Sequence, residues 1–278
     1  MKKVTIKDLY RNTENYIDKT VEVAGWVRTV RDSKAFGFRE LNDGSFFNNL
    51  QIVFNDKLAN FEEVRKLTIS SSIIVNGKVV KTENAKQPFE IHADSVEIFN
   101  LADADYPLQK KRHSFEYLRT VAHLRPRTNT FNAVFRIRSV AAFAIHEYFQ
   151  NNGYVYVNTP IITCADCEGS AEMFKLTTLD LDKPLPQKDG KTDFSEDLFG
   201  KKAYITGSGQ LHGETFAEAY GKIYTFGPTL RSENSNTKTH ANEFWMIEPE
   251  IAFCDLDQLM DIEEDCLKFV VSRVLEKC

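Results

Sequence analysis

The sequence of 278 residues lacks any apolar run that approaches the ~18 residues needed for a membrane-spanning helix. Its first residues, MKKVT, have no apolar signal-peptide core behind their charges. With 42% hydrophobic and 27% charged residues, the composition excludes collagen-like and disordered chains. We therefore expect a cytoplasmic protein with no membrane partner, organised as one large or two modest domains.

Cysteine is also scarce, and its number is odd. Cys164 and Cys167 have CxxC spacing, but a structural zinc site needs a second close pair, and Cys254 and Cys266 are twelve residues apart. Cys278 is the last residue. This pattern favours reduced, unligated thiols over a disulfide framework or a zinc site.

The net charge of −5 hides a basic segment. Residues 110–138 contain a single acid, Glu116, and eight basic residues: Lys110, Lys111, Arg112, Arg119, Arg125, Arg127, Arg136 and Arg138. Such a cluster is typical of a surface that binds a polyanion, and it is equally typical of a solvated linker. The charge pattern alone leaves both readings open.

Residues 1–102 have the pattern of a small β-barrel. Strand-like alternation occurs at 20–30, 36–41, 50–54, 72–80 and 89–99, and residues 57–67 have apolar side chains at helical spacing between the third and fourth runs. Five strands with a helix in this position are the order of an OB-fold. We predict an OB-fold domain over 1–102, followed by a basic hinge over 103–127.

The remaining residues, 128–278, predict a second, α+β domain. A helix is expected over 128–152, a polar surface loop over 177–202, two strands at 222–233 and 242–254, and a helix over 255–277 with an acidic first half. Because side chains alternate along a strand, one face of the two-stranded hairpin combines small residues with charged and aromatic ones. This face contains Arg231, Glu233, Phe244, Glu248 and Glu250.

A solvent-facing sheet surface is the simpler interpretation of that face. However, small residues beside an arginine and an aromatic ring also suit a nucleotide. A nucleotide needs an open surface to lie on, a bidentate hydrogen-bond donor for its phosphate and an aromatic ring on which its base stacks. Pro228 and Pro249 lie inside the two runs, so the sequence predicts bulges or edge positions there and leaves the register open.

Several motifs make the nucleotide reading specific. The segments FGPTLRSENSNT (226–237) and EFWMIEPE (243–250) resemble motif 2 of class II aminoacyl-tRNA synthetases, and are most similar to the asparaginyl family. GYVYVNTP (153–160) resembles motif 1, EGSA (168–171) a loop that closes over the amino acid, and GSGQL (207–211) the substrate-binding strand. In the barrel, GWVR (25–28) and NDGS (42–45) resemble the anticodon-binding domain of the same subclass.

The resemblance implies that L-asparagine is activated with ATP and Mg²⁺ to asparaginyl-adenylate and is then transferred to tRNA(Asn). As the catalytic, ATP-binding residues, Arg231 would hold the α-phosphate, Glu233 the adenine edge and His240 the distal phosphates, while Phe244 would stack on adenine. Because the asparagine carboxylate itself attacks the α-phosphorus, the protein supplies positioning and charge. Glu250 is the candidate Mg²⁺ ligand.

The same resemblance assigns the amino-acid site. Glu168 and Gln210 would bind the α-amino group. Aspartyl enzymes carry a lysine where this chain has Gly213 and an aspartate where it has Glu248. Without that lysine, and with Glu248 as an acceptor for the amide, the site would select asparagine over aspartate.

In the barrel, the resemblance implies that Phe38 stacks on the middle anticodon base, that Gln51 hydrogen-bonds this base, and that Arg28 lies near the backbone of the tRNA. Motif 1 implies a homodimer. An alternative for Phe38 is a place in the barrel core.

The sequence departs from the family pattern in two places. No glycine follows Gly227, so the glycine-rich motif 3 is absent and we expect the chain to be a portion that is cut off inside a helix. Thr239 replaces an arginine that relatives carry just before the residue that corresponds to His240, which predicts weaker binding of the distal phosphates of ATP. The alternatives are therefore an aspartyl-type or nondiscriminating synthetase, and a non-catalytic tRNA-binding fragment.

Overall fold

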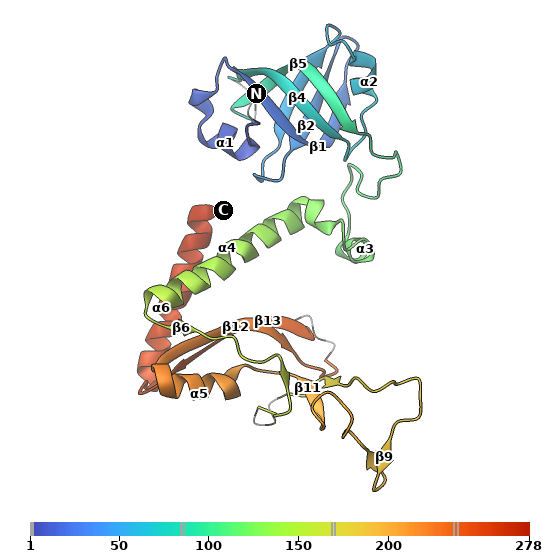
Figure 1. The fold of residues 1–278 in the computed structure, drawn as a ribbon. Coiled ribbons are helices and arrows are strands. Elements are labelled where there is room, and N and C mark those ends of the chain that lie inside the picture. The colour runs from blue at the N-terminus through green and yellow to red at the C-terminus, as the bar shows by residue number, and fades with distance from the viewer. Residues whose placement is uncertain are drawn as a thin grey trace. The chain divides into compact units, whose positions relative to one another are not determined.

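A computed structural model of the chain describes residues 3–83, 85, 87–167, 169, 171–235, 237 and 239–278. The chain divides into two compact units, Met1–Arg136 and Ile137–Cys278. Each unit is described by itself, with the elements labelled as in Figure 1. The predicted domain boundaries, which end the OB-fold domain at residue 102 and the hinge at residue 127, stay predictions.

The first unit contains a closed five-stranded barrel (Figure 1). Its strand order is β1-β2-β3-β5-β4, in which β3 and β5 run parallel and the other neighbours antiparallel. The predicted OB-fold barrel is thus confirmed, and each predicted strand is found within two residues. The strands are β1 (Thr20–Asp32), β2 (Phe36–Asn42), β3 (Leu50–Asn55), β4 (Ser72–Lys81) and β5 (Phe89–Asn100).

Alternation along these strands builds the barrel core. In β1, for example, Val21, Val23 and Val27 point inward and are buried. Helix α1 (Ile6–Arg11), which is capped by the Thr5 hydroxyl, adds Ile6 and Leu9 to the same core and is followed by the short helix η1 (Thr13–Asn15). Helix α2 (Phe61–Arg65) lies between β3 and β4, as predicted, but spans only five residues.

One charged residue, Arg39, lies inside this core with no exposed surface. Its Nη1 contacts Asp32 Oδ1 at 2.8 Å, and its Nη2 donates to the carbonyl oxygens of Val64 at 2.8 Å and Arg65 at 3.0 Å. The guanidinium therefore ties the last turn of α2 to strand β2. Its charge is paired and its Nη groups are hydrogen-bonded, which is the condition for burying a cation.

After β5, the chain continues through α3 (Phe115–Thr120), η2 (Arg125–Arg127) and α4 (Asn129–Asn151). The basic segment has a defined fold. The Ser114 hydroxyl caps α3, and Arg127 donates to the Tyr106 hydroxyl at 2.7 Å and to Ser70 at 3.3 Å. Helix α4 confirms the helix predicted over 128–152.

The second unit is organised around a sheet with the order β13-β12-β6, made of β6 (Val155–Tyr156), β12 (Lys222–Leu230) and β13 (Glu243–Ile251). On one face, Tyr224 and Phe226 pack with Phe149 of α4 and with residues of α6 (Leu256–Lys277). On the other face, Ile223 packs with Ala217 of α5 (Gln210–Tyr220). Figure 1 shows this helix beside the sheet. Two layers of helices thus enclose the hairpin.

Strands β12 and β13 pair without a bulge from Lys222↔Ile251 to Leu230↔Glu243. The two prolines do not interrupt this register. Pro249 lies on the edge strand, and Pro228 lies beyond the only part of β12 that pairs with β6, at Ile223 and Tyr224. Neither missing N–H removes a ladder hydrogen bond that the sheet needs.

The other predictions for this unit have mixed outcomes. Helix α6 confirms the helix over 255–277 and begins with a capping box between Asp255 and Gln258. Residues 207–211, interpreted above as a strand, are not one, because Gln210 already begins helix α5. The remaining short strands are β7 (Ile162–Thr163), β8 (Lys175–Leu176), β9 (Gln187–Lys188), β10 (Lys191–Thr192) and β11 (Ala203–Ile205).

The polar segment 177–202 contains the β9–β10 hairpin, which extends away from the sheet in Figure 1. Its base is fixed by the buried Asp197 carboxylate, which accepts hydrogen bonds from Thr177, Thr178 and the Leu198 N–H. These donors hold the pKa of Asp197 well below its usual range. Within the described ranges, no helix has the length and hydrophobicity to cross a membrane.

Candidate functional site

The face of the hairpin that packs against α5 combines small side chains in its centre with charged ones at its ends. Strand pairing places Thr225 opposite Glu248, Gly227 opposite Met246 and Thr229 opposite Phe244. The predicted division of the side chains of the two strands between two faces is therefore confirmed, whereas the use of this face as a binding site stays a prediction. A small cavity of about 60 Å³ lies on this face, lined among others by Thr225, Gly227 and Glu248.

Arg231 follows the end of β12 and lies over the ring of Phe244, with 5.5 Å between the guanidinium carbon and the ring centroid. Its Nε donates to the Gly207 carbonyl at 3.2 Å. A planar guanidinium held in this way, with nitrogen atoms left for another acceptor, is suited to a phosphate group. Sequence position and structure agree in bringing this arginine and this aromatic ring together.

Glu233 lies beyond Arg231 and is engaged with a neighbouring loop. Its carboxylate accepts a hydrogen bond from the Glu172 N–H at 3.1 Å, and the Glu172 carbonyl accepts hydrogen bonds from the Ser232 N–H at 2.7 Å and the Ser232 hydroxyl at 3.0 Å. Residue 172 is thereby joined to the segment after β12. The predicted amino-group ligand Glu168 lies just before it and is outside the described residues.

Glu248 has the most complete set of partners at the site. Its Oε1 accepts hydrogen bonds from the Ser208 hydroxyl and the Gly209 N–H, and its Oε2 accepts one from the Thr225 hydroxyl at 2.8 Å. The carboxylate is therefore fixed in one orientation beside the cavity. Ser208 and Thr225 were missed in the sequence analysis because they come from separate segments that only the fold brings together.

Gly209 is required for this arrangement. A Cβ atom at position 209 would lie 2.8 Å from Thr159 Oγ1 and 3.0 Å from Glu248 Oε2. Only glycine lets the backbone come close enough for its N–H to reach the carboxylate.

Gly213 and Gln210 lie on helix α5. A Cβ at position 213 would make ordinary contacts with Ile223 at 3.4 Å and Glu250 Cγ at 3.6 Å. A longer side chain at Gly213 would thus project toward Glu250 and Thr225. Gln210 is partly buried, and its side-chain amide donates to Glu214 at 3.1 Å.

Glu250 forms a contrast with Glu248. Burial, together with the nearby carboxylates of Glu214 and Glu248, raises its pKa. Across the described parts of the chain, no group of three or more His, Cys, Asp or Glu side chains is arranged to hold a metal ion. The role of Glu250 as a Mg²⁺ ligand stays a prediction. The five cysteines are free thiols.

His240, the predicted ligand of the distal phosphates, is exposed in the loop between the two strands. Its Nδ1 is hydrogen-bonded to the Thr237 hydroxyl. The structure places it near the end of the hairpin where Arg231 lies, since residue 231 pairs through its backbone with Asn242.

In the first unit, Phe38 and Gln51 lie on the outer face of the barrel. Arg31 connects them, because its guanidinium carbon lies 5.5 Å from the Phe38 ring centroid and its Nη2 donates to Gln51 Oε1 at 3.0 Å. Gln51 also donates to Glu90 at 2.8 Å. Arg31 was missed, although it pairs directly with Phe38 across strands β1 and β2.

Arg28, which was grouped with these residues from the sequence, lies elsewhere on the barrel. It occupies the irregularity in β1 between Val27 and Thr29 and lines two cavities together with Arg127. It makes no hydrogen bond or ion pair within the described residues. Burial is the main cause of its lowered pKa.

Comparison with known proteins agrees with this geometry. The family model for OB-fold nucleic acid binding domains matches residues 21–99, and the model for class II tRNA synthetases (D, K and N) matches residues 114–278. Asparagine–tRNA ligases of Acetivibrio thermocellus and Clostridium tetani are 61% and 60% identical to the chain, over 99% of it. The chain spans 60% of the length of each.

Among solved structures, the chain is similar to asparaginyl-tRNA synthetase from Pyrococcus horikoshii complexed with asparaginyl-adenylate, with a TM-score of 0.83 and 28% identity. This match covers 99% of the chain and 59% of that protein. The predicted family is thus confirmed over both units: the chain belongs to the class II tRNA synthetases of the D, K and N group.

Proposed function

We propose that this chain serves the activation of L-asparagine with ATP to asparaginyl-adenylate and its transfer to tRNA(Asn). The observation that carries the proposal is the carboxylate of Glu248, which Ser208, Gly209 and Thr225 hold in place, together with a glycine and no charged side chain at position 213. An anchored carboxylate accepts a hydrogen bond from an amide N–H₂ group and repels a second carboxylate. Asparagine, rather than aspartate, is the amino acid that suits this pair.

The arrangement around Arg231 supports the ATP-dependent step. In that step the asparagine carboxylate attacks the α-phosphorus of ATP and pyrophosphate leaves, so no protein nucleophile is needed. Arg231 would hold the α-phosphate, Glu233 the adenine edge, and Phe244 would stack on adenine. Preorganised charge of this kind stabilises the negative charge that develops on the phosphate oxygens.

Further partners belong to the same proposal. Mg²⁺ is commonly held by one or two carboxylates together with substrate phosphates, so Glu250 alone would suffice on the protein side, where the ion would neutralise charge on the triphosphate. The outer face of the barrel at Phe38 and Gln51 would bind the anticodon of tRNA(Asn) by stacking and edge contacts. We also propose a cytoplasmic homodimer.

The test is amino-acid-dependent exchange of pyrophosphate into ATP, with asparagine and aspartate compared side by side. Exchange with asparagine that is lost in Arg231→Gln is the expected result, and Arg119→Gln is the matched control on an exposed arginine of the first unit. Exchange with aspartate would overturn the amino-acid assignment. No exchange with either would overturn catalysis by this chain and leave the tRNA-binding alternative.

A further inference from the structure

Two adjoining cavities in the first unit lie apart from the Phe38–Gln51 face. The larger has a volume of about 990 Å³ and lies between the barrel and the segment that follows it; the smaller has about 260 Å³. They share the lining residues Arg28, Ser70, Arg127 and Asn129, so they meet at the two arginines. Neither cavity has a role in the proposed function.

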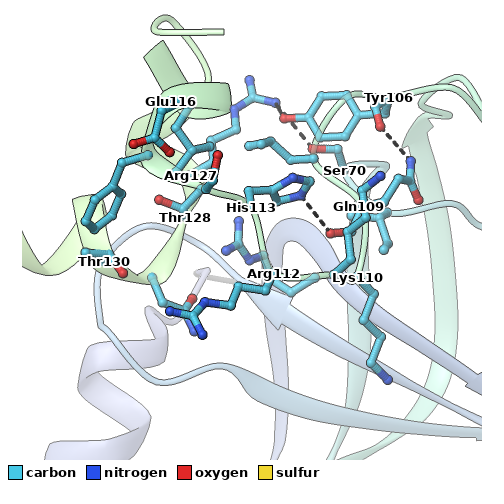
Figure 2. A pocket seen from close by; sticks show the side chains of 18 residues that line it. Ser70, Tyr106, Gln109, Lys110, Arg112, His113, Glu116, Arg127, Thr128 and Thr130 are labelled. Atoms are coloured by element: carbon cyan, nitrogen blue, oxygen red, sulfur yellow. Dashed lines mark hydrogen bonds between the residues drawn. The ribbon is translucent and has the colours of Figure 1, made fainter. Parts of the chain in front are cut away.

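The two arginines bring like charges together without a bridging carboxylate. Arg127 is held in place by the Tyr106 and Ser70 hydroxyls, as Figure 2 shows, and Arg28 has no hydrogen-bonding or ion-pair partner in the described structure. Burial is the main cause that lowers the pKa of Arg28; Tyr106 acts in the opposite direction, Arg127 lowers the pKa further, and Glu40 has the smallest influence. An anion between the two guanidinium groups would satisfy both.

The smaller cavity offers stacking surfaces beside this cation pair. Trp26 and Phe47 line it, and each is about half exposed, at 49%. The side-chain amide of Asn129 also lines it and makes no hydrogen bond within the described ranges. Exposed aromatic rings next to arginines are the combination that binds a base together with its phosphate.

The rim of the larger cavity is also cationic. Lys110, Lys111 and Arg112 line this cavity, as does the acidic residue Glu116. Figure 2 shows His113, whose Nε2 is hydrogen-bonded to the Gln109 carbonyl at 3.2 Å. His113 is further held by stacking on Tyr117, with 5.1 Å between the ring centroids. These residues give the cavity a fixed wall and a positive entrance, which attracts phosphorylated ligands.

We infer that the two cavities form a nucleotide-binding site, with a phosphate between Arg28 and Arg127 and a base against Trp26 and Phe47. The ligand class is a phosphorylated nucleotide, either free or as one residue of a single-stranded RNA. The inference goes beyond the proposed function and does not depend on asparagine activation.

The experiment uses the fluorescence of Trp26 in the whole chain. Since the sequence has two tryptophans, Trp245→Phe leaves Trp26 as the single reporter. The probes are adenosine 5′-monophosphate and a single-stranded RNA hexamer, each titrated alone, with adenosine and inorganic phosphate as partial ligands. We expect quenching by the monophosphate, at least tenfold weaker binding of adenosine, and displacement of the monophosphate by inorganic phosphate.

Arg28→Gln is the decisive variant, because Arg28 has no protein partner to lose, and it should weaken binding at least tenfold. Arg119→Gln should bind as the parent does. Quenching by both probes identifies a site for free nucleotides, and quenching by RNA alone identifies an RNA strand as the source; either supports the inference if it depends on Arg28. Absence of quenching by both probes, or quenching that depends on Phe38→Ala but not on Arg28→Gln, overturns it.

The assay contains neither asparagine nor ATP, so its failure is separate from a failure of pyrophosphate exchange. Circular dichroism of Arg28→Gln checks that the barrel is intact. If that variant does not fold, Arg127→Gln replaces it, because Arg127 is the second guanidinium group of the site. Binding of the monophosphate by Arg127→Gln as tightly as by the parent then overturns the inference.

Discussion

The barrel and the second, catalytic unit each contain a charged residue held by hydrogen bonds, Arg39 and Glu248, but they hold it differently. Arg39 is completely buried, and all its acceptors are protein atoms: Asp32 and backbone carbonyl oxygens, including those of α2. Glu248 is only partly buried, and although three donor groups hold it, it borders a cavity. The first charge is enclosed by its partners, and the second is held at a surface that a ligand reaches.

This difference separates a structural charge from a functional one. Arg39 is paired with Asp32 and both of its Nη atoms donate to protein acceptors, while its buried Nε has no hydrogen-bond partner. A charge that is enclosed and paired in this way contributes to the fold and is out of reach of a ligand. A charge that is oriented by the protein but faces a cavity is preorganised for recognition. Changes at Arg39 should therefore affect stability, and changes at Glu248 should affect substrate selection.

Arg39→Met should have the largest effect. The substitution leaves the carbonyl oxygens of Val64 and Arg65 and the Asp32 carboxylate without their donor, and breaking a buried pair in this way costs about 3–5 kcal/mol. Urea denaturation followed by Trp26 fluorescence in a Trp245→Phe background measures the loss. Arg119→Met, at an exposed position, should stay within about 0.5 kcal/mol. A cost below about 1 kcal/mol for Arg39→Met would show that its partners are satisfied by water.

Glu248→Gln should reduce asparagine-dependent pyrophosphate exchange by about 100-fold, with little loss of stability. The neutral amide keeps the shape of the side chain, but its N–H₂ group now faces one of the three donors and no longer attracts the substrate amide. Exchange assays and thermal melting on the same preparation separate the two effects. If melting falls and exchange does not, Glu248 is a second structural charge and the contrast with Arg39 disappears.

Gly213→Lys tests the other half of the amino-acid site. The new side chain would extend toward Glu250 and Thr225, and its ammonium group would compete with the substrate amide, which should lower asparagine-dependent exchange about tenfold. Gly213→Ala adds only a Cβ with ordinary contacts and should cost less than about threefold, while gaining helix propensity. Equal losses in both variants would mean that space, and not charge, matters at position 213.

The sequence predicts the barrel better than the catalytic unit, and the reason is local. In the barrel, alternation over strands of six or more residues sets the inward positions. Arg39 occupies one of them, between Gly37 and Leu41, but the burial of this charged residue was not predicted from the sequence. In the catalytic unit, alternation places Glu248 and Phe244 on the correct face. However, the anchors Ser208 and Thr225 are brought together by contacts far apart in sequence. The interpretation of residues 207–211 as a strand was wrong because it rested on the resemblance of GSGQL to a family motif, whereas the first turn of α5 begins at Gln210.

Asp197 is a third charged residue that is held by hydrogen bonds. It sharpens the comparison between Arg39 and Glu248 because it is buried in the same unit as Glu248 but does not line the cavity beside Glu248. Its hydrogen-bond donors lower its pKa, so the folded state favours the carboxylate. The resulting stability is fully present above about pH 5 and is lost as the pH falls below the ordinary value of about 4 toward the folded-state pKa. Asp197→Asn should therefore lower Tm by a few degrees between pH 5 and 8, with a deficit that shrinks below about pH 4.

The matched control for this substitution is Asp189→Asn, in the exposed turn between β9 and β10, which should show no such pH dependence. Melting curves from pH 3 to 8 for both variants measure the difference. Pyrophosphate exchange by Asp197→Asn at pH 7 should stay close to that of the parent. We expect this because a buried charge whose hydrogen-bond donors are all protein groups contributes to stability and not to substrate binding, in either unit. A large loss of exchange would mean that the base of the β9–β10 segment positions the substrate site, and that burial alone does not distinguish the two kinds of charge.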